Sequence, residues 1–304
     1  MIVDSGAGFA TSAAATPKRP TAKRHSLNSM KYLLPMLIST ALPVSASVII
    51  TFAEDPDAYH SSLEGTSYYD FNDLKTGYNS GVVWDGVGKF DQLQILRADA
   101  YGGAPDETSP NGTLYSVQGV GSKVLTTTLF LAEDSSYFGM WWSAGDARNV
   151  LSFYDGDSLI GRFTTASLME PLPPEYDGNP INRKVNSGEP YAFINFFGDE
   201  KTTWDRIVFS NDGSSGFESD NYTTRVDAWD PAKDGALPGT PVAIVSGTST
   251  QLITNKDLEG TRWSLDETTV AHAPGAPVPP WTLLAAFGAV FALRKHKNKR
   301  AVTA

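Results

Sequence analysis

The chain has 304 residues, no cysteine and a formal net charge of −10 at pH 7. Without cysteine it forms no disulfide, no zinc–thiolate site and no thiol nucleophile. Residues 1–47 hold five of the 24 basic residues and one acidic residue, and residues 294–304 hold five basic residues and no acidic one. Of the 34 acidic residues, the intervening body therefore holds 33 against 14 basic ones, a formal charge of −19 that disfavours nucleic acid as a partner. The same charge has a simpler use, which is to keep an exported domain soluble.

The start of the chain predicts export. Residues 1–29 are polar, and we expect them to be disordered and to precede the true start. Residues 30–47 have the layout of a secretory signal, with Lys31 at the start, an apolar run over 32–44 and small residues at 45–47, where we expect cleavage. A long basic leader or a twin-arginine signal is the alternative, and it predicts export as well.

Residues 48–231 are predicted to form a single β-sandwich domain with a jelly-roll-like arrangement. The segments with the strongest strand pattern are rich in β-branched and aromatic residues and are bounded by Gly, Asp, Asn or Pro: 124–131, 149–154, 159–164, 191–197 and 206–210. Asp155-Gly156 lies between two of them and favours a tight hairpin turn, since both residues tolerate a positive φ. Many short strands joined by turns indicate an all-β fold.

Other parts of the body do not have this strand pattern. The polar stretches 102–112 and 170–188 are predicted loops, and loops of this length are often functional or mobile. Residues 232–247 contain several glycines and prolines and look like a linker, and residues 248–271 are expected to supply the last strands of the domain.

The end of the chain has three parts. A Pro-rich spacer over 272–280 leads into an uncharged apolar run over 281–293, which is followed by a basic tail over 294–304. The run has 13 residues, fewer than the roughly 20 that span a membrane, so a transmembrane helix here would need its flanks. The positive-inside rule places the tail in the cytoplasm. The basic residues that would stop the helix are Arg294, Lys295, Lys297, Lys299 and Arg300.

This three-part tail resembles the PEP-CTERM sorting signal that exosortases of Gram-negative bacteria recognise. The positions that match its motif are Val278, Pro279, Pro280 and Trp281. The family's glutamate is absent here, so the likeness lies in the layout. It implies an exosortase as partner, transient attachment to the inner membrane, and release to the cell surface or extracellular matrix. A plain anchor that is never cut is the alternative.

A second resemblance covers about residues 120–230. The motifs that carry it are the segments 137–146, 187–196, 204–211 and 216–221, which include Trp-Ser-Ala-Gly-Asp, Gly-Glu-Pro-Tyr-Ala and Gly-Phe-Glu-Ser-Asp-Asn. Together they resemble a family of exosortase-dependent surface proteins. Membership implies export and residence at the surface or in the matrix, with no catalytic chemistry.

Aromatic residues suggest a polysaccharide as a further partner. Trp204 and Trp229 stand near predicted loops, and in a strand the neighbouring rings of Trp141 and Trp142 point to opposite faces. An outward ring can stack on a sugar, so Trp204, Trp229 and Trp142 are candidates for a glycan platform. The alternative is that all of these rings are covered by the core or by loops.

Acidic turns suggest calcium as the one possible cofactor. Asp146, Glu218 and Asp220 are candidate ligands, since calcium binds six to eight oxygens and Glu218 and Asp220 lie in a Gly-rich turn. No EF-hand pattern is present. Hydrogen-bonded turns without a metal are the alternative.

Catalysis has little support in the sequence. Only His60 and His272 remain in the processed body, and no Gly-x-Ser-x-Gly motif occurs. The leading hypothesis is therefore a non-catalytic exported protein with weak glycan binding. The alternative is a glycoside hydrolase with Glu189 and Glu218 as its two carboxyl groups.

Overall fold

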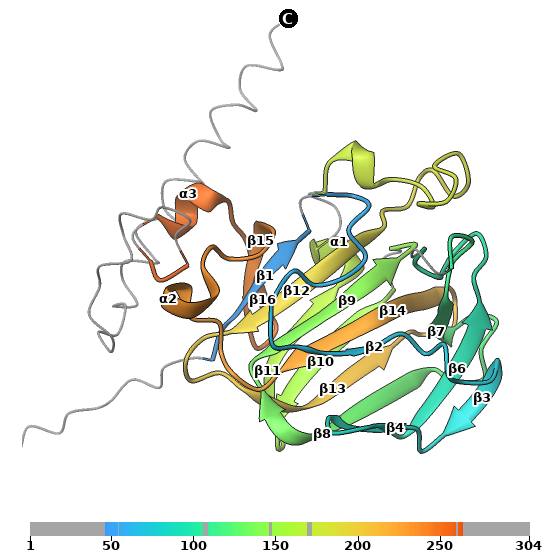
Figure 1. Cartoon of the computed structure of the whole chain (residues 1–304), viewed down its shortest axis with the longest axis horizontal. Helices are drawn as coiled ribbons and strands as arrows, with labels where there is room; N and C mark the ends of the chain where they lie inside the picture. Colours follow the sequence, from blue (N-terminus) through green and yellow to red (C-terminus); the bar gives the residue numbers. More distant parts are fainter. Residues whose placement is uncertain are drawn as a thin grey trace, which may run out of the picture. The chain divides into compact units, whose positions relative to one another are not determined.

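Two antiparallel β-sheets stack face to face in the computed structural model, so the predicted all-β sandwich is confirmed (Figure 1). The structure describes residues 46–53, 55–105, 109–145, 148–168, 172–259 and 261–263, which all belong to one unit. The predicted signal segment before residue 46, the sorting motif, the apolar run 281–293 and the basic tail lie outside these residues. Within the described ranges, no helix is long and apolar enough to cross a membrane.

The larger sheet runs in the order β16-β15-β1-β12-β9-β14-β7-β6-β3, and β2 also pairs with β14. Its strands are β1 (Val48–Phe52), β2 (Ser67–Tyr69), β3 (Gly77–Ser80), β6 (Gln92–Arg97), β7 (Leu114–Gly119), β9 (Tyr137–Ser143), β12 (Ala192–Gly198), β14 (Gly216–Arg225), β15 (Thr240–Ser246) and β16 (Ser249–Leu252).

The smaller sheet runs in the order β11-β10-β13-β8-β5-β4. Its strands are β4 (Val83–Trp84), β5 (Gly88–Phe90), β8 (Thr126–Ser135), β10 (Val150–Asp155), β11 (Ser158–Thr164) and β13 (Trp204–Ser210). Short helices occur only between strands or after them: α1 (Thr165–Leu168), the 3₁₀ turn η1 (Pro174–Tyr176), α2 (Pro231–Asp234) and α3 (Asn255–Leu258).

The strand predictions agree with the structure where the side chains alternate. Each of the five segments predicted as strands overlaps one observed strand, and β10 and β11 form a hairpin around Asp155-Gly156. The described parts of 102–112 and 170–188 contain no strand, as predicted.

The prediction of a linker over 232–247 is wrong. Residues 240–246 form β15, which pairs with β1, and Figure 1 shows the two strands side by side. Pro241 has no N–H to donate, which argues against a strand in the sequence. The register shifts between Ile50 and Thr51, opposite this proline, so the ladder accommodates it. The predicted last strands over 248–271 amount to β16 alone in the described residues, since α3 and a turn follow it.

Aromatic rings fill the space between the sheets. Phe138 of β9 is fully buried at the centre of this core. Its ring centroid lies 5.4 to 6.3 Å from those of four other rings, which belong to Tyr222, Phe153, Phe209 and Phe196. Such aromatic packing supplies much of the apolar burial that stabilises a domain without disulfides.

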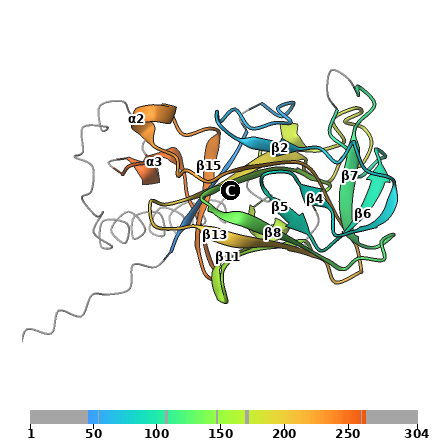
Figure 2. The ribbon, with the colours of Figure 1, turned by 60° about the horizontal axis from the view of Figure 1, so that its bottom comes forward.

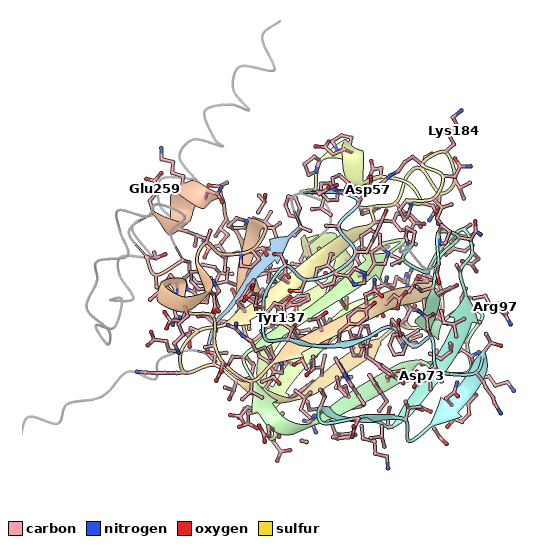
Figure 3. The ribbon with its side chains drawn as sticks, in the orientation of Figure 1. Asp57, Asp73, Arg97, Tyr137, Lys184 and Glu259 are labelled. Atoms are coloured by element: carbon pink, nitrogen blue, oxygen red, sulfur yellow. The ribbon has the colours of Figure 1, made fainter. Side chains whose placement is uncertain are left out.

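The outer face of the larger sheet is also covered. Trp141 and Tyr137 point away from the core, yet both are fully buried. Tyr59, from the segment after β1, packs edge-on against Trp141 with ring centroids 4.8 Å apart. The hydroxyl of Tyr137, which is labelled in Figure 3, donates to the side-chain oxygen of Asn195 at 2.7 Å and accepts from the Ser61 hydroxyl at 2.6 Å. Loops therefore form a third layer over this sheet.

Candidate functional site

The three tryptophans predicted to form a glycan platform are buried. Trp142 and Trp204 have no exposed surface and lie in the core between the sheets. Trp229 is also fully buried, because Trp263 stacks on it with ring centroids 5.1 Å apart. A ring stacks on a sugar only through an exposed face, so the prediction of a platform at these residues is wrong.

The candidate calcium ligands are only partly brought together. Glu218 and Asp220 lie two residues apart on β14, on the same outer face of the larger sheet, with 8% and 0% of their surface exposed. Asp146 lies outside the described residues. Among the described residues no group of three metal-binding side chains occurs. Calcium binding stays a prediction.

Asp220 has a structural role in these contacts. Its carboxyl group accepts hydrogen bonds from the Asn221 N–H at 2.7 Å and the Ala104 N–H at 3.3 Å, and it shares a third hydrogen bond with the Thr113 hydroxyl. Burial raises the pKa of Asp220 well above its ordinary value, although these three hydrogen bonds act in the opposite direction. A carboxyl group with these properties ties Ala104 and Thr113 to β14.

Asn221 lies at a bulge of β14 where two polar residues, Asp220 and Asn221, are buried. Its φ is +52°, a left-handed conformation that asparagine tolerates, and the register of β14 against β9 shifts at this point. The Asn221 side chain donates to the Tyr59 carbonyl at 2.8 Å and accepts from the Tyr68 hydroxyl at 2.6 Å. The bulge therefore anchors the covering segment to the sheet.

Glu189 and Glu218, the two carboxyl groups of the glycoside hydrolase alternative, both act on the phenol of Tyr191. Burial raises the pKa of Tyr191, a hydrogen bond from Asn186 lowers it, and the charges of Glu189 and Glu218 raise it further. Glu189 also accepts a hydrogen bond from Asn186. Because Glu218 is nearly inaccessible, a polysaccharide would have to displace covering loops to reach both groups.

The smaller sheet is different, because its outer side remains accessible. Figure 2 shows β8, β13 and β11 along the side of the sandwich away from β2. On β10, Leu151 and Phe153 point into the core, so Val150, Ser152 and Tyr154 point outward. We call the outward side of the strands β11-β10-β13-β8-β5-β4 the open face.

Rings and cations alternate in one row across the open face. Tyr154 of β10 stands opposite Arg206 of β13, which stands opposite Phe130 of β8. Phe130 in turn stands opposite Lys89 of β5, and Val83 of β4 follows. Phe130 is 49% exposed and Val83 is 64% exposed. The Arg206 guanidinium lies over the Tyr154 ring, 4.6 Å from its centroid, so a cation–π contact holds the two side chains in place.

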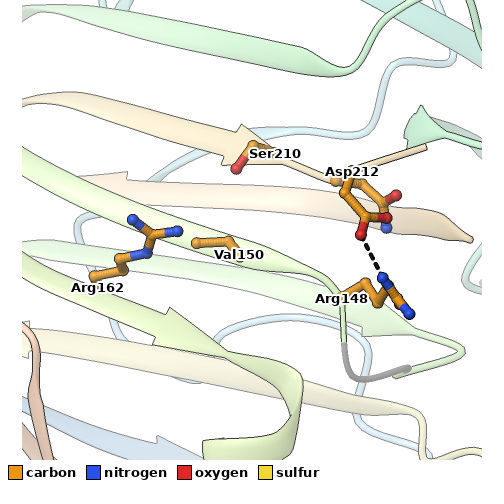
Figure 4. Close-up of a pocket in the computed structure, with 6 residues that line it drawn as sticks. Arg148, Val150, Arg162, Ser210 and Asp212 are labelled. Atoms are coloured by element: carbon orange, nitrogen blue, oxygen red, sulfur yellow. Dashed lines mark hydrogen bonds and ion pairs between the residues drawn. The ribbon is translucent and has the colours of Figure 1, made fainter. Parts of the chain in front are cut away.

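A shallow groove crosses the same face at its other end. Its volume is about 590 Å³, and Figure 4 shows Val150 on its floor between Arg162 and the pair formed by Arg148 and Asp212. Ser210 adds a hydroxyl group to the lining. The groove is therefore flanked by two guanidinium groups, with one aliphatic side chain between them.

Only one of these arginines has an acidic partner. Arg148 donates to Asp212 at 2.5 Å. Hydrogen bonds from the Ser214 hydroxyl and backbone N–H, together with Arg148, lower the pKa of Asp212 to about 2. Arg162 is exposed, and within the described ranges its guanidinium has no ion pair.

Sequence reasoning missed this face, although the strands that build it were predicted. The alternation of residues within 124–131 and 206–210 already separates inward from outward side chains. The signal is the set of Thr, Arg, Ser and ring side chains on the polar side of four predicted strands, of which Phe130 and Arg162 are exposed in the structure. What the sequence lacked was the observation that loops cover the other sheet and leave this one exposed.

The comparisons with known proteins add no name to this site. No protein-family model matches the chain, and no curated protein matches it either. The candidate site therefore rests on the geometry of the open face.

Proposed function

We propose that this chain is an exported, non-catalytic protein that binds polysaccharide through the open face of its smaller sheet. The observation that carries the proposal is the difference between the two outer surfaces of the sandwich. Loops bury Trp141 and Tyr137 on the outer side of the larger sheet's central strand β9, although Tyr78 on the edge strand β3 is exposed, while Phe130 on β8 of the smaller sheet is half-exposed. Exposed apolar side chains rimmed by polar ones are typical of interaction surfaces, and Phe130 and Val83 lie in one row with Lys89 and Arg206 on this face.

The chemistry of the open face suits a sugar chain. A sugar presents C–H groups that pack on rings such as Tyr154 and Phe130, and hydroxyl groups that bond to polar side chains. Ser210, Thr126 and Val150 lie in one row across three strands, which gives the face both polar and apolar contacts. We propose a jelly-roll-like scaffold for this function, with binding that is weak at each site and repeated along the polymer.

The two terminal segments support a proposal for where the protein is sorted in the cell. The signal-like segment 30–47 supports export, and the layout over 272–304 supports sorting by an exosortase. We propose transient attachment to the inner membrane of a Gram-negative bacterium, followed by release to the cell surface or the extracellular polysaccharide matrix. Mass spectrometry of the mature protein should find a C-terminus between Pro277 and Trp281. An intact Ala304 would contradict sorting.

Affinity electrophoresis tests the proposed binding. The full-length protein, kept in mild detergent, is run through gels that contain one polysaccharide at a time, and binding slows its migration. Phe130→Ala should weaken the retardation, because it removes an exposed ring from the open face. Tyr78→Ala is the matched control, since Tyr78 is a 55% exposed ring on β3 of the larger sheet. No retardation by any polysaccharide would refute the proposal.

The hydrolase alternative is tested in the same preparation. A reducing-sugar assay on the retained polysaccharides should detect no hydrolysis if the protein only binds. Hydrolysis that disappears in Glu218→Gln or Glu189→Gln would overturn the non-catalytic assignment. Hydrolysis that survives both changes would point to a contaminating enzyme.

A further inference from the structure

We infer that the open face selects acidic polysaccharides, and that Arg162 pairs with a carboxylate of a uronic acid unit. The inference rests on the proposed function, because it names the class of polysaccharide that the same face takes. Three features of that face carry the inference. They are its basic side chains, the exposed guanidinium of Arg162, which has no ion pair among the described residues, and the contact that holds Arg206 over Tyr154.

The open face holds four basic side chains, although the domain as a whole is acidic. The body between the terminal segments has a formal charge of −19. Arg148, Arg162, Arg206 and Lys89 nevertheless gather on one side of one sheet. A carboxylate that reaches Arg162 or Arg206 on this face gains a local attraction that the acidic surface elsewhere does not offer.

The acidic groups near this face are largely engaged. Asp212 is paired with Arg148, and Asp91 accepts hydrogen bonds from the N–H groups of Gln92 and Thr128. Asp205 accepts from the N–H of Gly156 at 3.1 Å. The exposed Asp155 and Asp157 lie in the hairpin turn, at the end of the face away from the groove. No acidic side chain therefore neutralises Arg162 among the described residues.

Arg162 has the properties of a carboxylate receptor. Its guanidinium is planar, permanently charged and able to donate two parallel hydrogen bonds to one carboxylate. It stands opposite Ser152 in the β10–β11 ladder and borders the groove that Val150 floors (Figure 4). A sugar ring in the groove would rest on Val150 while its carboxylate reaches Arg162.

The row of rings extends the groove along the same polymer. Arg206 donates to the Gly156 carbonyl at 2.8 Å and lies over Tyr154, so its position is set before any ligand arrives. This row is parallel to the one that contains Arg162 and Ser152, about two residues further along the strands. A flexible chain with one carboxylate per sugar can contact both rows.

Nucleic acid fits the same charges less well. Double-stranded DNA carries one charge per about 1.7 Å of its axis, so most of its phosphates would face the acidic remainder of the domain. A uronic acid polymer has fewer charges and more C–H surface for Phe130 and Tyr154. We therefore commit to an acidic polysaccharide and use nucleic acid as an arm of the test.

The experiment compares four gels with the full-length protein in mild detergent. They contain polygalacturonate, the same polymer with its carboxyl groups chemically reduced to alcohols, dextran, or double-stranded DNA. We expect strong retardation by polygalacturonate, little by its reduced form, and none by DNA. The retardation should fall as salt rises from 0.1 M to 1 M, where the Debye length shrinks from about 10 Å to 3 Å.

Substitutions then test whether Arg162 is the side chain that binds polygalacturonate. Arg162→Gln should weaken polygalacturonate binding by about tenfold, the lower range for losing a hydrogen bond to a charged group. Arg162→Lys should give an intermediate loss, since it keeps the charge but not the two-pronged geometry. Arg97→Gln is the matched control because Arg97 is an exposed arginine on β6 of the larger sheet, labelled in Figure 3, and it should bind like the wild type.

The outcomes separate the inference from the proposed function. Equal retardation by polygalacturonate and its reduced form would overturn the inference and leave polysaccharide binding intact. No retardation by any sugar polymer would refute both. Retardation by DNA as strong as by polygalacturonate, or an Arg162→Gln variant that binds normally, would also overturn the assignment of a uronate site.

Discussion

Replacement of Asp220 by asparagine should remove a dependence of stability on pH. Asparagine has the same shape and no charge, and its side-chain oxygen can still accept from the Asn221 N–H. In the folded protein burial raises the pKa of Asp220, while in the unfolded chain it is about 3.9. The folded state therefore holds its proton at a higher pH than the unfolded state does.

The sign of the effect follows from this difference. Above about pH 4 the unfolded chain releases the proton first, so the wild type loses stability as pH rises, until the pKa of the folded state is passed. For a single proton the slope is at most about 1.4 kcal/mol per pH unit. Below the unfolded pKa the contribution is constant. Asp220→Asn lacks this slope, so its advantage over the wild type should grow from pH 4 upward.

The contacts agree with a protonated carboxyl group. The Thr113 hydroxyl lies 2.9 Å from the Ala104 carbonyl and also contacts Asp220. One hydroxyl hydrogen cannot serve both acceptors. If Asp220 donates to Thr113, then Thr113 can donate to Ala104 and every group has a partner.

Replacement of Asp220 by alanine measures how much its hydrogen bonds contribute to the free energy of unfolding. Asp220→Ala leaves the N–H groups of Ala104 and Asn221 without their acceptor, and each costs about 1–3 kcal/mol when buried. We therefore expect Asp220→Ala to be about 2–6 kcal/mol less stable than the wild type near pH 4, with no slope from residue 220, so this difference should shrink as pH rises.

Urea denaturation of the full-length protein from pH 4 to pH 8 measures these differences. Asp157→Asn is the control, because Asp157 is exposed in the β10–β11 turn and has the same change of charge. If the free energies of unfolding of the wild type and Asp220→Asn run parallel over this range, the reasoning is refuted. It is also refuted if Asp220→Ala is as stable as Asp220→Asn.

Three other changes test the packing. Phe138→Ala should cost about 3–5 kcal/mol in urea denaturation, because the ring is fully buried among four others, and Phe138→Leu should cost clearly less. Arg225→Gln should cost about 3 kcal/mol by the same assay, since Arg225 and Asp234 form a two-pronged pair at 2.9 and 2.7 Å with side chains 9% and 14% exposed. The hydrogen bond from Arg225 lowers the pKa of Asp234, so this pair's contribution should be lost as pH falls towards acid, and an acid titration that leaves it unchanged would contradict the assignment. Tyr137→Phe should cost about 1–2 kcal/mol through the bonds to Ser61 and Asn195, whereas Tyr78→Phe on the exposed β3 should cost nothing measurable.

The contrast between the two sheets is the main functional observation. Loops cover the outer side of the larger sheet around its central strand β9, whereas Phe130 and Arg162 stay exposed on the outer side of the smaller sheet. The covering residues come from segments that are far apart in the chain, such as Tyr59 after β1, Ala104 before β7, Tyr191 before β12 and Trp229 after β14. A binding surface on the smaller sheet is the simplest use of that asymmetry.

Local pattern was sufficient to predict five of the sixteen strands and the all-β sandwich. Segments such as 149–154 and 159–164 alternate in polarity, and Asp155-Gly156 favours the turn between them, so neighbouring residues alone carry this information. The terminal segments were also interpreted from local composition, and those interpretations stay predictions. β15 was missed because Gly239 and Pro241 normally end a strand, whereas here the sheet shifts its register to accept the proline.

Only the tertiary structure decided which rings are accessible. Trp229 looks exposed in the sequence because it stands near glycines and prolines, but Trp263, 34 positions later, covers it. Phe130 belongs to a strand as apolar as its neighbours, yet it is half-exposed because no loop closes over its sheet. Burial depends on contacts between segments that are distant in the chain, and a side chain's own neighbours in sequence carry no record of them.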